Sequence, residues 1–517
     1  MSRFKRFTHS LLSGYIQLAV NSVFTLVSVR MALHYLSQAQ YGLWMPIATI
    51  AIYINLLDFG LSAAAARIFV DYKDHHQAEE YGAIIQTSIW VGLTQTALVF
   101  LAGIILAFVL GPLLHIPHGL QGDFFWLVLG QCTLTAATFA TRFVSMLLTA
   151  NQRFDVNNYA NSFSLIINCG VMWWGFSQQC GIFSMLWGQV AAVVSNLAIN
   201  WFACQKLRLF PRKGQWGRPT WEKFRELFVF GRDIFLFSIG SQLINFSQTL
   251  LLTRLMGLET VVIWSVCTRG CAILLQVISR VFDYSTSALA EMIVRGERER
   301  LLHRFREIEV LLVNMALAGG ALLAVCNSSF VDVWTSGKIH WLPWNDLLLA
   351  VWMLVCLTVR AHTGLVGQVK AFRLMPYFFL LEGSAFIGLT ILMHRFGGIT
   401  MMLAISIVCS LCCTLPYGLR RTCEYFHLSW RDLARWHYGT LALAASVAPV
   451  ALLVWWLASN LPGLPRLILQ STVLGTWTAC MFFCFGLGAS LRAELCHRAP
   501  VWAKSILLWA RGRKVDV

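Results

Sequence analysis

Charged residues are scarce in this chain of 517 residues. Asp, Glu, Lys and Arg together make up 12% of it, whereas hydrophobic residues make up 57%. A soluble protein of this length needs far more charge to cover its surface, so a soluble fold is excluded. Apolar stretches of about 20 residues, the length of a membrane-spanning helix, recur along the whole sequence. The sequence therefore predicts an all-α, polytopic membrane protein.

Several motifs that define other functions are missing from the sequence. It contains no Walker-type phosphate loop, so direct use of ATP is not expected. No nucleic-acid-binding motif accompanies the net charge of +16, which membrane orientation explains better. The 15 cysteines lie mostly inside apolar stretches, and the adjacent pair Cys412 and Cys413 lacks a metal-ligand spacing. We expect no disulfide framework, no cofactor or metal, no catalytic residue and no nucleic-acid partner.

Fourteen membrane spans are predicted. They lie near 11–36, 42–66, 83–110, 124–149, 159–178, 181–204, 229–254, 260–287, 308–333, 346–367, 376–394, 399–418, 438–459 and 467–490. Most Lys and Arg residues fall in alternate loops, which are the N-terminus, 205–225, 291–306, 419–437 and the tail from Arg492. This asymmetry places both termini in the cytoplasm. The apolar run after the basic N-terminus continues without a cleavage site, so the first span is expected to be retained.

The loops on the opposite side of the membrane are short. The longest are about 111–123 and 334–345. Membrane glycan polymerases and ligases usually build their sites on long external loops, so short loops argue against that class of enzyme.

Polar residues of the first span recur in the seventh when the sequence is shifted by about 224 residues. The matched pairs are Gln17 with Ser241, Asn21 with Asn245, Thr25 with Thr249, Arg30 with Arg254 and, after a small shift, Asp58 with Asp283. Both spans run outward from the cytoplasm, so the repeat is parallel. It predicts two six-helix bundles around a central cavity, plus two C-terminal helices. The expected parts are an N-terminal bundle (1–204), a basic linker (205–228), a second bundle (229–418), an extra helix pair (419–490) and a cytoplasmic tail (491–517).

The segment from Asp58 to Arg67 is the most informative motif. An acidic residue, a glycine and four alanines at the inner end of span two let helices pack closely around a buried charge. Asp58 either pairs with Arg67 or a neighbouring helix, or forms a protonatable or cation-coupling site.

Span eight combines several polar residues on one face. At 100° per residue, Arg269, Gln276, Arg280 and Asp283 share a stripe about 60° wide, and the two arginines are about 16 Å apart along the helix. Arginine suits a pyrophosphate because its planar fork donates two hydrogen bonds. Asp283 can pair with Arg280 while the site is empty. The alternative is a structural ion-pair stripe between helices.

Other intramembrane polar residues have two interpretations each. Gln17 and Asn21, like Asn245 in span seven, bind either sugar hydroxyls or neighbouring helices. Arg30 and Arg254 lie near the outer ends and either gate the exit or extend to lipid headgroups.

Arg142 and Arg360 occupy equivalent places in the inner halves of spans four and ten. They either recruit a pyrophosphate from the cytoplasmic leaflet or anchor the helices at the interface. His362, two residues further on, is expected at the interface.

Tyr41-Gly-Leu-Trp44 and the run from Leu56 to Arg67 resemble the oligosaccharide and polysaccharide flippases of the MOP (multidrug, oligosaccharidyl-lipid and polysaccharide) exporter superfamily. The resemblance implies twelve or fourteen spans in two six-helix halves. It also implies a transporter of the bacterial inner membrane, which flips an undecaprenyl-pyrophosphate-linked glycan from the cytoplasmic to the outer leaflet by alternating access. The expected partners are this lipid-linked glycan and the bilayer, with a glycan polymerase or another polysaccharide-assembly protein as a further candidate.

Two related functions and one unrelated function stay open. A cation-coupled multidrug exporter of the same superfamily would need acidic residues in a largely apolar cavity, whereas the charge inside these spans is mainly arginine. A peptidoglycan-precursor flippase shares the fourteen-span plan. A membrane glycan polymerase or ligase is the alternative from another class.

Overall fold

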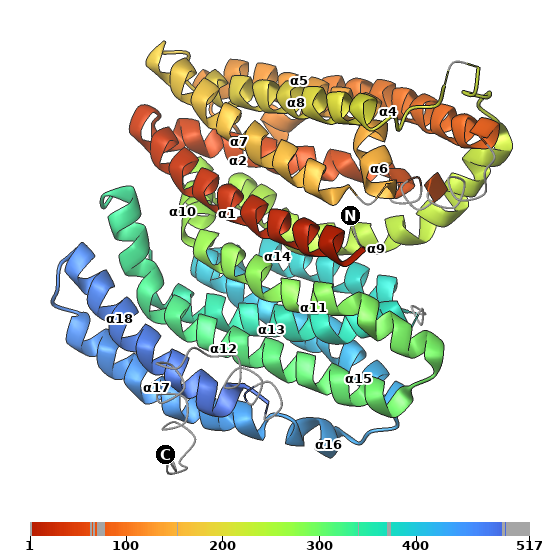
Figure 1. Cartoon of the computed structure of the whole chain (residues 1–517). Helices are drawn as coiled ribbons and strands as arrows, with labels where there is room; N and C mark the ends of the chain where they lie inside the picture. The colour runs from red at the N-terminus through yellow and green to blue at the C-terminus, as the bar shows by residue number, and fades with distance from the viewer. Residues whose placement is uncertain are drawn as a thin grey trace. The chain divides into compact units, whose positions relative to one another are not determined.

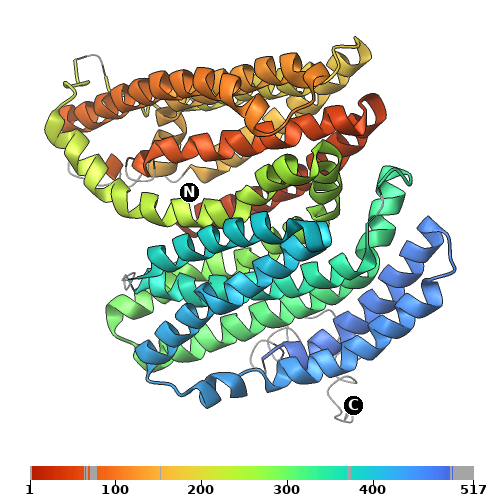
Figure 2. The same ribbon diagram turned by 180° about the vertical axis from the view of Figure 1, so that it is seen from behind.

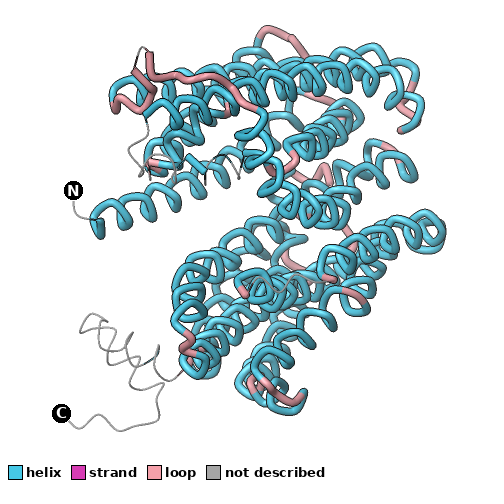
Figure 3. The backbone as a smooth tube through the Cα atoms, turned by 90° about the vertical axis from the view of Figure 1, so that its right-hand side faces the viewer, coloured by secondary structure: helices cyan, strands magenta, loops and turns pink. Residues whose placement is uncertain are grey.

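A computed structural model shows helices joined by loops (Figure 3), and the residues that it describes contain no strand. The described residues are 3–62, 65, 68–69, 78–151, 153–212, 214–339, 341–369, 374–488 and 492. The all-α class predicted from the sequence is confirmed.

The chain divides into two compact units, Met1–Val262 and Ile263–Val517. Unit 1 contains α1 (Arg3–Tyr35), α2 (Gln38–Ile54), the 3₁₀ turn η1 (Asn55–Asp58), α4 (Ala78–Leu113), α5 (His118–Thr141), α6 (Phe143–Ala150), α7 (Phe154–Ser177), α8 (Phe183–Lys206) and α9 (Trp221–Met256), and α10 (Leu258–Cys267) crosses the boundary. Unit 2 contains α11 (Arg269–Arg295), α12 (Arg298–Thr335), α13 (Pro343–Gln368), α14 (Met375–Cys412), α15 (Thr414–Phe426), α16 (Trp430–Arg435), α17 (Tyr438–Ala458), α18 (Gly463–Met481) and a π-helical turn (Phe482–Gly486).

Each unit is built from long helices packed side by side. In unit 1, α7 packs against α1 and α8, α4 packs against α5, and α9 packs against α2 and α4 (Figure 1). In unit 2, α12 packs against α11, α13 and the pair α17 and α18 (Figure 2). The division between the units falls one long helix later than the linker predicted at 205–228. The arrangement as two six-helix bundles stays a prediction.

The predicted spans coincide with helices. Nine helical stretches of the described residues are long and apolar enough to cross a membrane, or ten if the bent pair α10 and α11 forms one span. The stretch Met375–Phe426 covers two predicted spans, because Gly398 (φ 55°) interrupts α14 between them. The three other predicted spans are α7, α8 and α9, which have the length of a span but contain more polar residues.

Span two is shorter than predicted. Ser37 caps α2, because its hydroxyl accepts a hydrogen bond from the Gln40 N–H at 3.2 Å while the Gln40 side chain accepts one from the Ser37 N–H at 3.0 Å. After η1, Phe59 (φ 51°) and Gly60 (φ 72°) adopt the left-handed conformation. A continuous helix over 42–66 is therefore wrong, because the chain turns at Phe59 and Gly60, where the glycine tolerates positive φ. The turn leaves Asp58 at a helix end.

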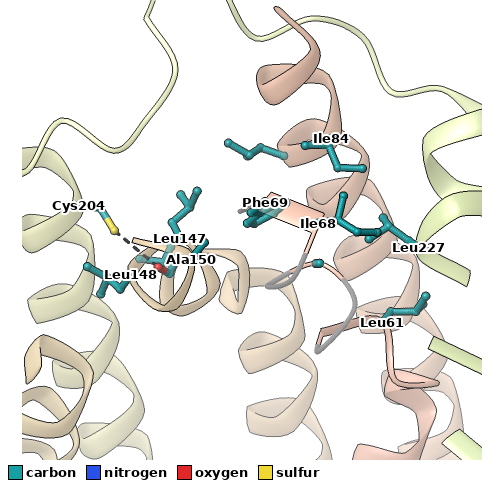
Figure 4. Close-up of a cluster of buried hydrophobic side chains, with 12 residues drawn as sticks. Leu61, Ile68, Phe69, Ile84, Leu147, Leu148, Ala150, Cys204 and Leu227 are labelled. Atoms are coloured by element: carbon teal, nitrogen blue, oxygen red, sulfur yellow. Dashed lines mark hydrogen bonds between the residues drawn. The ribbon is translucent and has the colours of Figure 1, made fainter. Parts of the chain in front are cut away.

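A buried hydrophobic cluster fixes the chain after this turn. It joins Leu61, Ile68 and Phe69 to Ile84 of α4, Leu147 and Leu148 of α6, Cys204 of α8 and Leu227 of α9 (Figure 4). The Cys204 thiol donates to the Val144 carbonyl at 3.6 Å. All cysteines in the described part of the chain are free.

Gly92 allows α4 and α5 to approach closely, because a Cβ there would lie 2.8 Å from the Phe139 carbonyl oxygen. Gly170, inside α7, has no atom within 4 Å of its Cβ position. We expect Gly92→Ala to lower the free energy of unfolding by about 1–3 kcal/mol through overpacking. Gly170→Ala should leave it unchanged or raise it by up to about 1 kcal/mol. Thermal unfolding in detergent measures both, and equal shifts would contradict the close approach.

Candidate functional site

Asp58 has a fixed orientation at the turn that follows α2. Only 16% of its side chain is exposed. The Ser62 N–H donates to Oδ2 at 3.1 Å, and the Ser62 hydroxyl donates to Oδ1 at 2.5 Å. Gln95 of α4 donates from Nε2 to the carbonyl oxygens of Leu57 at 3.0 Å and Asp58 at 3.1 Å. These hydrogen bonds hold both the turn and the carboxylate.

Arg142 is the cation that pairs with Asp58, and it lies at the break between α5 and α6. Its Nη1 donates to Asp58 Oδ1 at 2.8 Å and to the Ser62 hydroxyl at 2.9 Å, and its Nη2 donates to Asn55 Oδ1 at 2.8 Å. The guanidinium carbon lies 4.0 Å from the centre of the Phe139 ring. A guanidinium has five N–H donors, so these contacts leave two for another acceptor. Asp58 thus has its partner on a neighbouring helix.

A cavity of about 340 Å³ lies beside Arg142, between α5, α6, α7 and α8. Its other polar wall residues include Thr138, Thr141, Ser145, Asn161, Asn196 and Asn200. Asn200 Nδ2 donates to Asn196 Oδ1 at 3.0 Å, and Asn196 Nδ2 donates to Asn161 Oδ1 at 2.7 Å. Asn200 Oδ1 is buried and has no hydrogen-bond partner among the residues that the structure describes. The cavity therefore offers one cation together with neutral donors and acceptors, the groups that bind sugar hydroxyls.

Unit 2 contains an aspartate–arginine pair at the equivalent places of the repeat. Arg360 of α13 donates from Nη2 to Asp283 Oδ1 of α11 at 2.5 Å, as Arg142 does to Asp58 in unit 1. The partner of Asp283 is therefore not Arg280, which is exposed and has no ion pair within the described residues. Packing of α13 against α11 brings the more distant arginine to the carboxylate.

The other polar residues of α11 lie on its less buried side. Gln276 and Arg280 are exposed, whereas Ile278 and Phe282 on the opposite side are buried. Arg269 is half-buried, and its Nε has no hydrogen-bond partner. The predicted stripe is thus present, and its role in binding a pyrophosphate stays a prediction.

The other predicted site residues lie apart from this cavity. Gln17 and Asn21 are half-buried on α1, and Arg30 is exposed. Arg254 is exposed and contacts the ring of His115 within unit 1. The roles predicted for these four residues stay predictions. The side chains of Arg67 and Asn245 lie outside the described residues.

Sequence reasoning missed the asparagines of the cavity. Their spacing contained a signal, because Asn196 and Asn200 lie four residues apart on α8 and therefore share a face. Asn161 and Ser164 lie three residues apart on α7. Polar pairs of this kind inside membrane helices either join helices or line a cavity, and here they do both.

Comparison with known proteins agrees with this architecture. The profile described as "Polysaccharide biosynthesis protein" matches residues 10–289, more than half of the chain. The chain belongs to this family. No curated protein sequence matches it. Among solved structures, the lipid II flippase MurJ in an inward closed conformation aligns with a TM-score of 0.64 and 12% identity, over 92% of this chain and 98% of the flippase. An inward-facing multidrug resistance MATE family transporter of the MOP superfamily aligns with a TM-score of 0.60 and 12% identity, over 78% and 96%.

The predicted membership of the polysaccharide biosynthesis protein family is thereby confirmed. The chain is a polytopic helical protein with the fold of the solved membrane transporters and flippases that it matches, among them a transporter of the MOP superfamily. Identities of 12% show the fold alone. The nature of the substrate has to be argued from the chain's own residues.

Proposed function

We propose that this transporter moves an undecaprenyl-pyrophosphate-linked oligosaccharide from the cytoplasmic to the outer leaflet of a bacterial inner membrane. The observation that supports this most strongly is the cavity of unit 1, where Arg142 lies among neutral amides and hydroxyls. A guanidinium suits a pyrophosphate, and amide groups suit sugar hydroxyls. Both kinds of group are needed to bind such a substrate.

The mechanism follows from the Asp58–Arg142 pair. A pyrophosphate that contacts Arg142 competes with the Asp58 carboxylate, so substrate binding changes the stability of the turn after α2 and biases the two access states. The glycan passes through the polar interior while the polyprenyl tail stays in lipid. Both termini lie in the cytoplasm, and a glycan polymerase or another polysaccharide-assembly protein receives the product.

A cation-coupled multidrug exporter is the second candidate, because unit 2 contains buried carboxylates, among them Glu382 and Glu309. Glu382 accepts hydrogen bonds from the hydroxyls of Ser410 and Thr414, both at 2.5 Å, and Glu309 is fully buried. Neither residue lines the 340 Å³ cavity, whereas Arg142 does. The glycan-lipid substrate therefore has the stronger support.

Reconstitution separates the two functions. In liposomes that contain the purified protein, we expect a fluorescent undecaprenyl-pyrophosphate glycan to change leaflet at least tenfold faster than in protein-free liposomes. The same tail and glycan without the pyrophosphate should stay near the protein-free rate, because Arg142 then has no anion to bind. Uptake of a cationic dye together with no movement of the glycan lipid would contradict the proposal and favour the exporter.

A further inference from the structure

A second cavity, of about 390 Å³, lies in unit 2 where the first turn of α12 meets the end of α13 and the end of α15. One side is apolar and consists of Leu365, Val366 and Val369. The other side consists of Arg298, Arg421, Glu424 and Tyr425. It shares no residue with the Arg142 cavity. It adjoins the segments 291–306 and 419–437, whose basic residues predict that this end of the unit lies at the cytoplasmic membrane surface.

The Arg298 guanidinium is held in place without a carboxylate. Its carbon lies 5.2 Å from the centre of the Tyr425 ring, and Nη2 donates to the Tyr425 carbonyl oxygen. Its Nη2 also lies 3.4 Å from His427 Nε2, and no carboxylate among the described residues pairs with it. Arg298 also begins α12, where the helix dipole favours anions. Its charge is therefore available to a ligand.

Positive charge exceeds negative charge at this cavity. Arg420 Nε and Arg421 Nη1 both donate to Glu424, at 2.8 Å and 2.6 Å, so two arginines share this carboxylate and Arg298 is a third cation beside it. The Arg421 side chain is 20% exposed and lines the cavity, so its guanidinium is partly open to a ligand there.

We propose that this cavity binds the phosphate group of a membrane lipid, with Arg298 and Arg421 on the phosphate and the lipid chain along Leu365, Val366 and Val369. Paired guanidinium groups are well suited to phosphate oxygens, and anionic headgroups gather at basic surfaces of the cytoplasmic leaflet. An apolar wall next to them favours a phosphate that is attached to a hydrocarbon. Two lipids have this chemistry, an anionic phospholipid and a polyprenyl pyrophosphate, and the site does not depend on the transport function proposed above.

Native mass spectrometry of the full chain in detergent tests this site. The probes are phosphatidic acid, undecaprenyl pyrophosphate, diacylglycerol, which lacks a phosphate, and inorganic pyrophosphate. We expect the first two to bind at least tenfold more tightly than the last two, and the stronger of the two phosphate lipids identifies the source of the phosphate. Equal binding of diacylglycerol would overturn the phosphate site, and equal binding of inorganic pyrophosphate would overturn the lipid.

Variants assign the binding to this cavity. The double variant Arg298→Gln, Arg421→Gln should bind the phosphate lipid at least tenfold more weakly. Glu424→Gln should bind it severalfold more tightly, because the competing carboxylate is removed, and a misfolded protein would not show that gain. Arg300→Gln is the matched control on α12, since Arg300 pairs with Glu297 and does not line the cavity. Unchanged binding in the double variant, or weaker binding in Glu424→Gln, would refute the assignment.

Discussion

Replacing Arg142 with glutamine is expected to reduce translocation of the glycan lipid by more than tenfold. Arg142 is the one cation among the described residues that line the 340 Å³ cavity, so the variant leaves the pyrophosphate without a charged partner there. Charge-assisted hydrogen bonds to phosphate are about twice as strong as neutral ones. The rate of leaflet exchange in proteoliposomes, measured over a range of substrate concentrations, gives both kcat and KM.

Asp58→Asn distinguishes a substrate-binding arginine from a purely structural one. The amide keeps an oxygen near Arg142 and the Ser62 hydroxyl but does not compete with an anion, so KM for the glycan lipid should fall. Arg153→Gln is the matched control, since Arg153 pairs with Asp155 at 3.1 Å and does not line the cavity. It should change transport less than twofold. If Asp58→Asn and Arg142→Gln lose activity equally and KM is unchanged, the pair is structural.

The membrane helices were the most predictable part of this fold. In lipid, the backbone must satisfy its own hydrogen bonds, so the length and apolarity of a segment almost determine that it is a helix. The places where a helix breaks were less predictable. The turn at Phe59 and Gly60 depends on two residues in the left-handed conformation inside an otherwise apolar run. The parallel repeat placed Asp58 and Asp283, and also Arg142 and Arg360, at equivalent positions, and each unit pairs its own two residues.

The partners of these charges were harder to predict than their positions. Helical spacing favours partners three or four residues away, as in the expected pair Asp283 and Arg280. Packing of α11 against α13 instead selects Arg360, 77 residues further along the chain. The sequence predicts His362 at the membrane interface, but the structure buries it fully. The acidic group that faces it, Glu309, lies on another helix. Contacts of this kind arise from tertiary packing and leave no periodic signal in one sequence.

Glu309 forms a buried contact between three parts of unit 2. Its Oε1 lies 3.7 Å from His362 Nε2 on α13 and 3.4 Å from Nε2 of His437, which directly precedes α17. The Thr422 hydroxyl donates to the Gly418 carbonyl at 3.0 Å, so its oxygen accepts from His362 Nδ1–H at 2.9 Å. The Nε2 atom of His362 is therefore left facing the carboxylate, at a distance longer than a hydrogen bond. These contacts bring the start of α17 next to α12 and α13.

Glu309→Leu is expected to lower the free energy of unfolding by about 1–3 kcal/mol, because the buried His362 ring loses the polar group that faces it. Glu309→Gln keeps an acceptor for the histidines and should cost less. Thermal unfolding measures the overall effect, and the rate of tryptic cleavage after Arg435, next to His437, measures whether the start of α17 is released. Glu307→Gln is the control on the same helix, because its partner Arg304 is exposed and surface pairs contribute at most about 1 kcal/mol. If Glu309→Leu and Glu307→Gln have the same stability and the same cleavage rate, the buried contact does not hold α17.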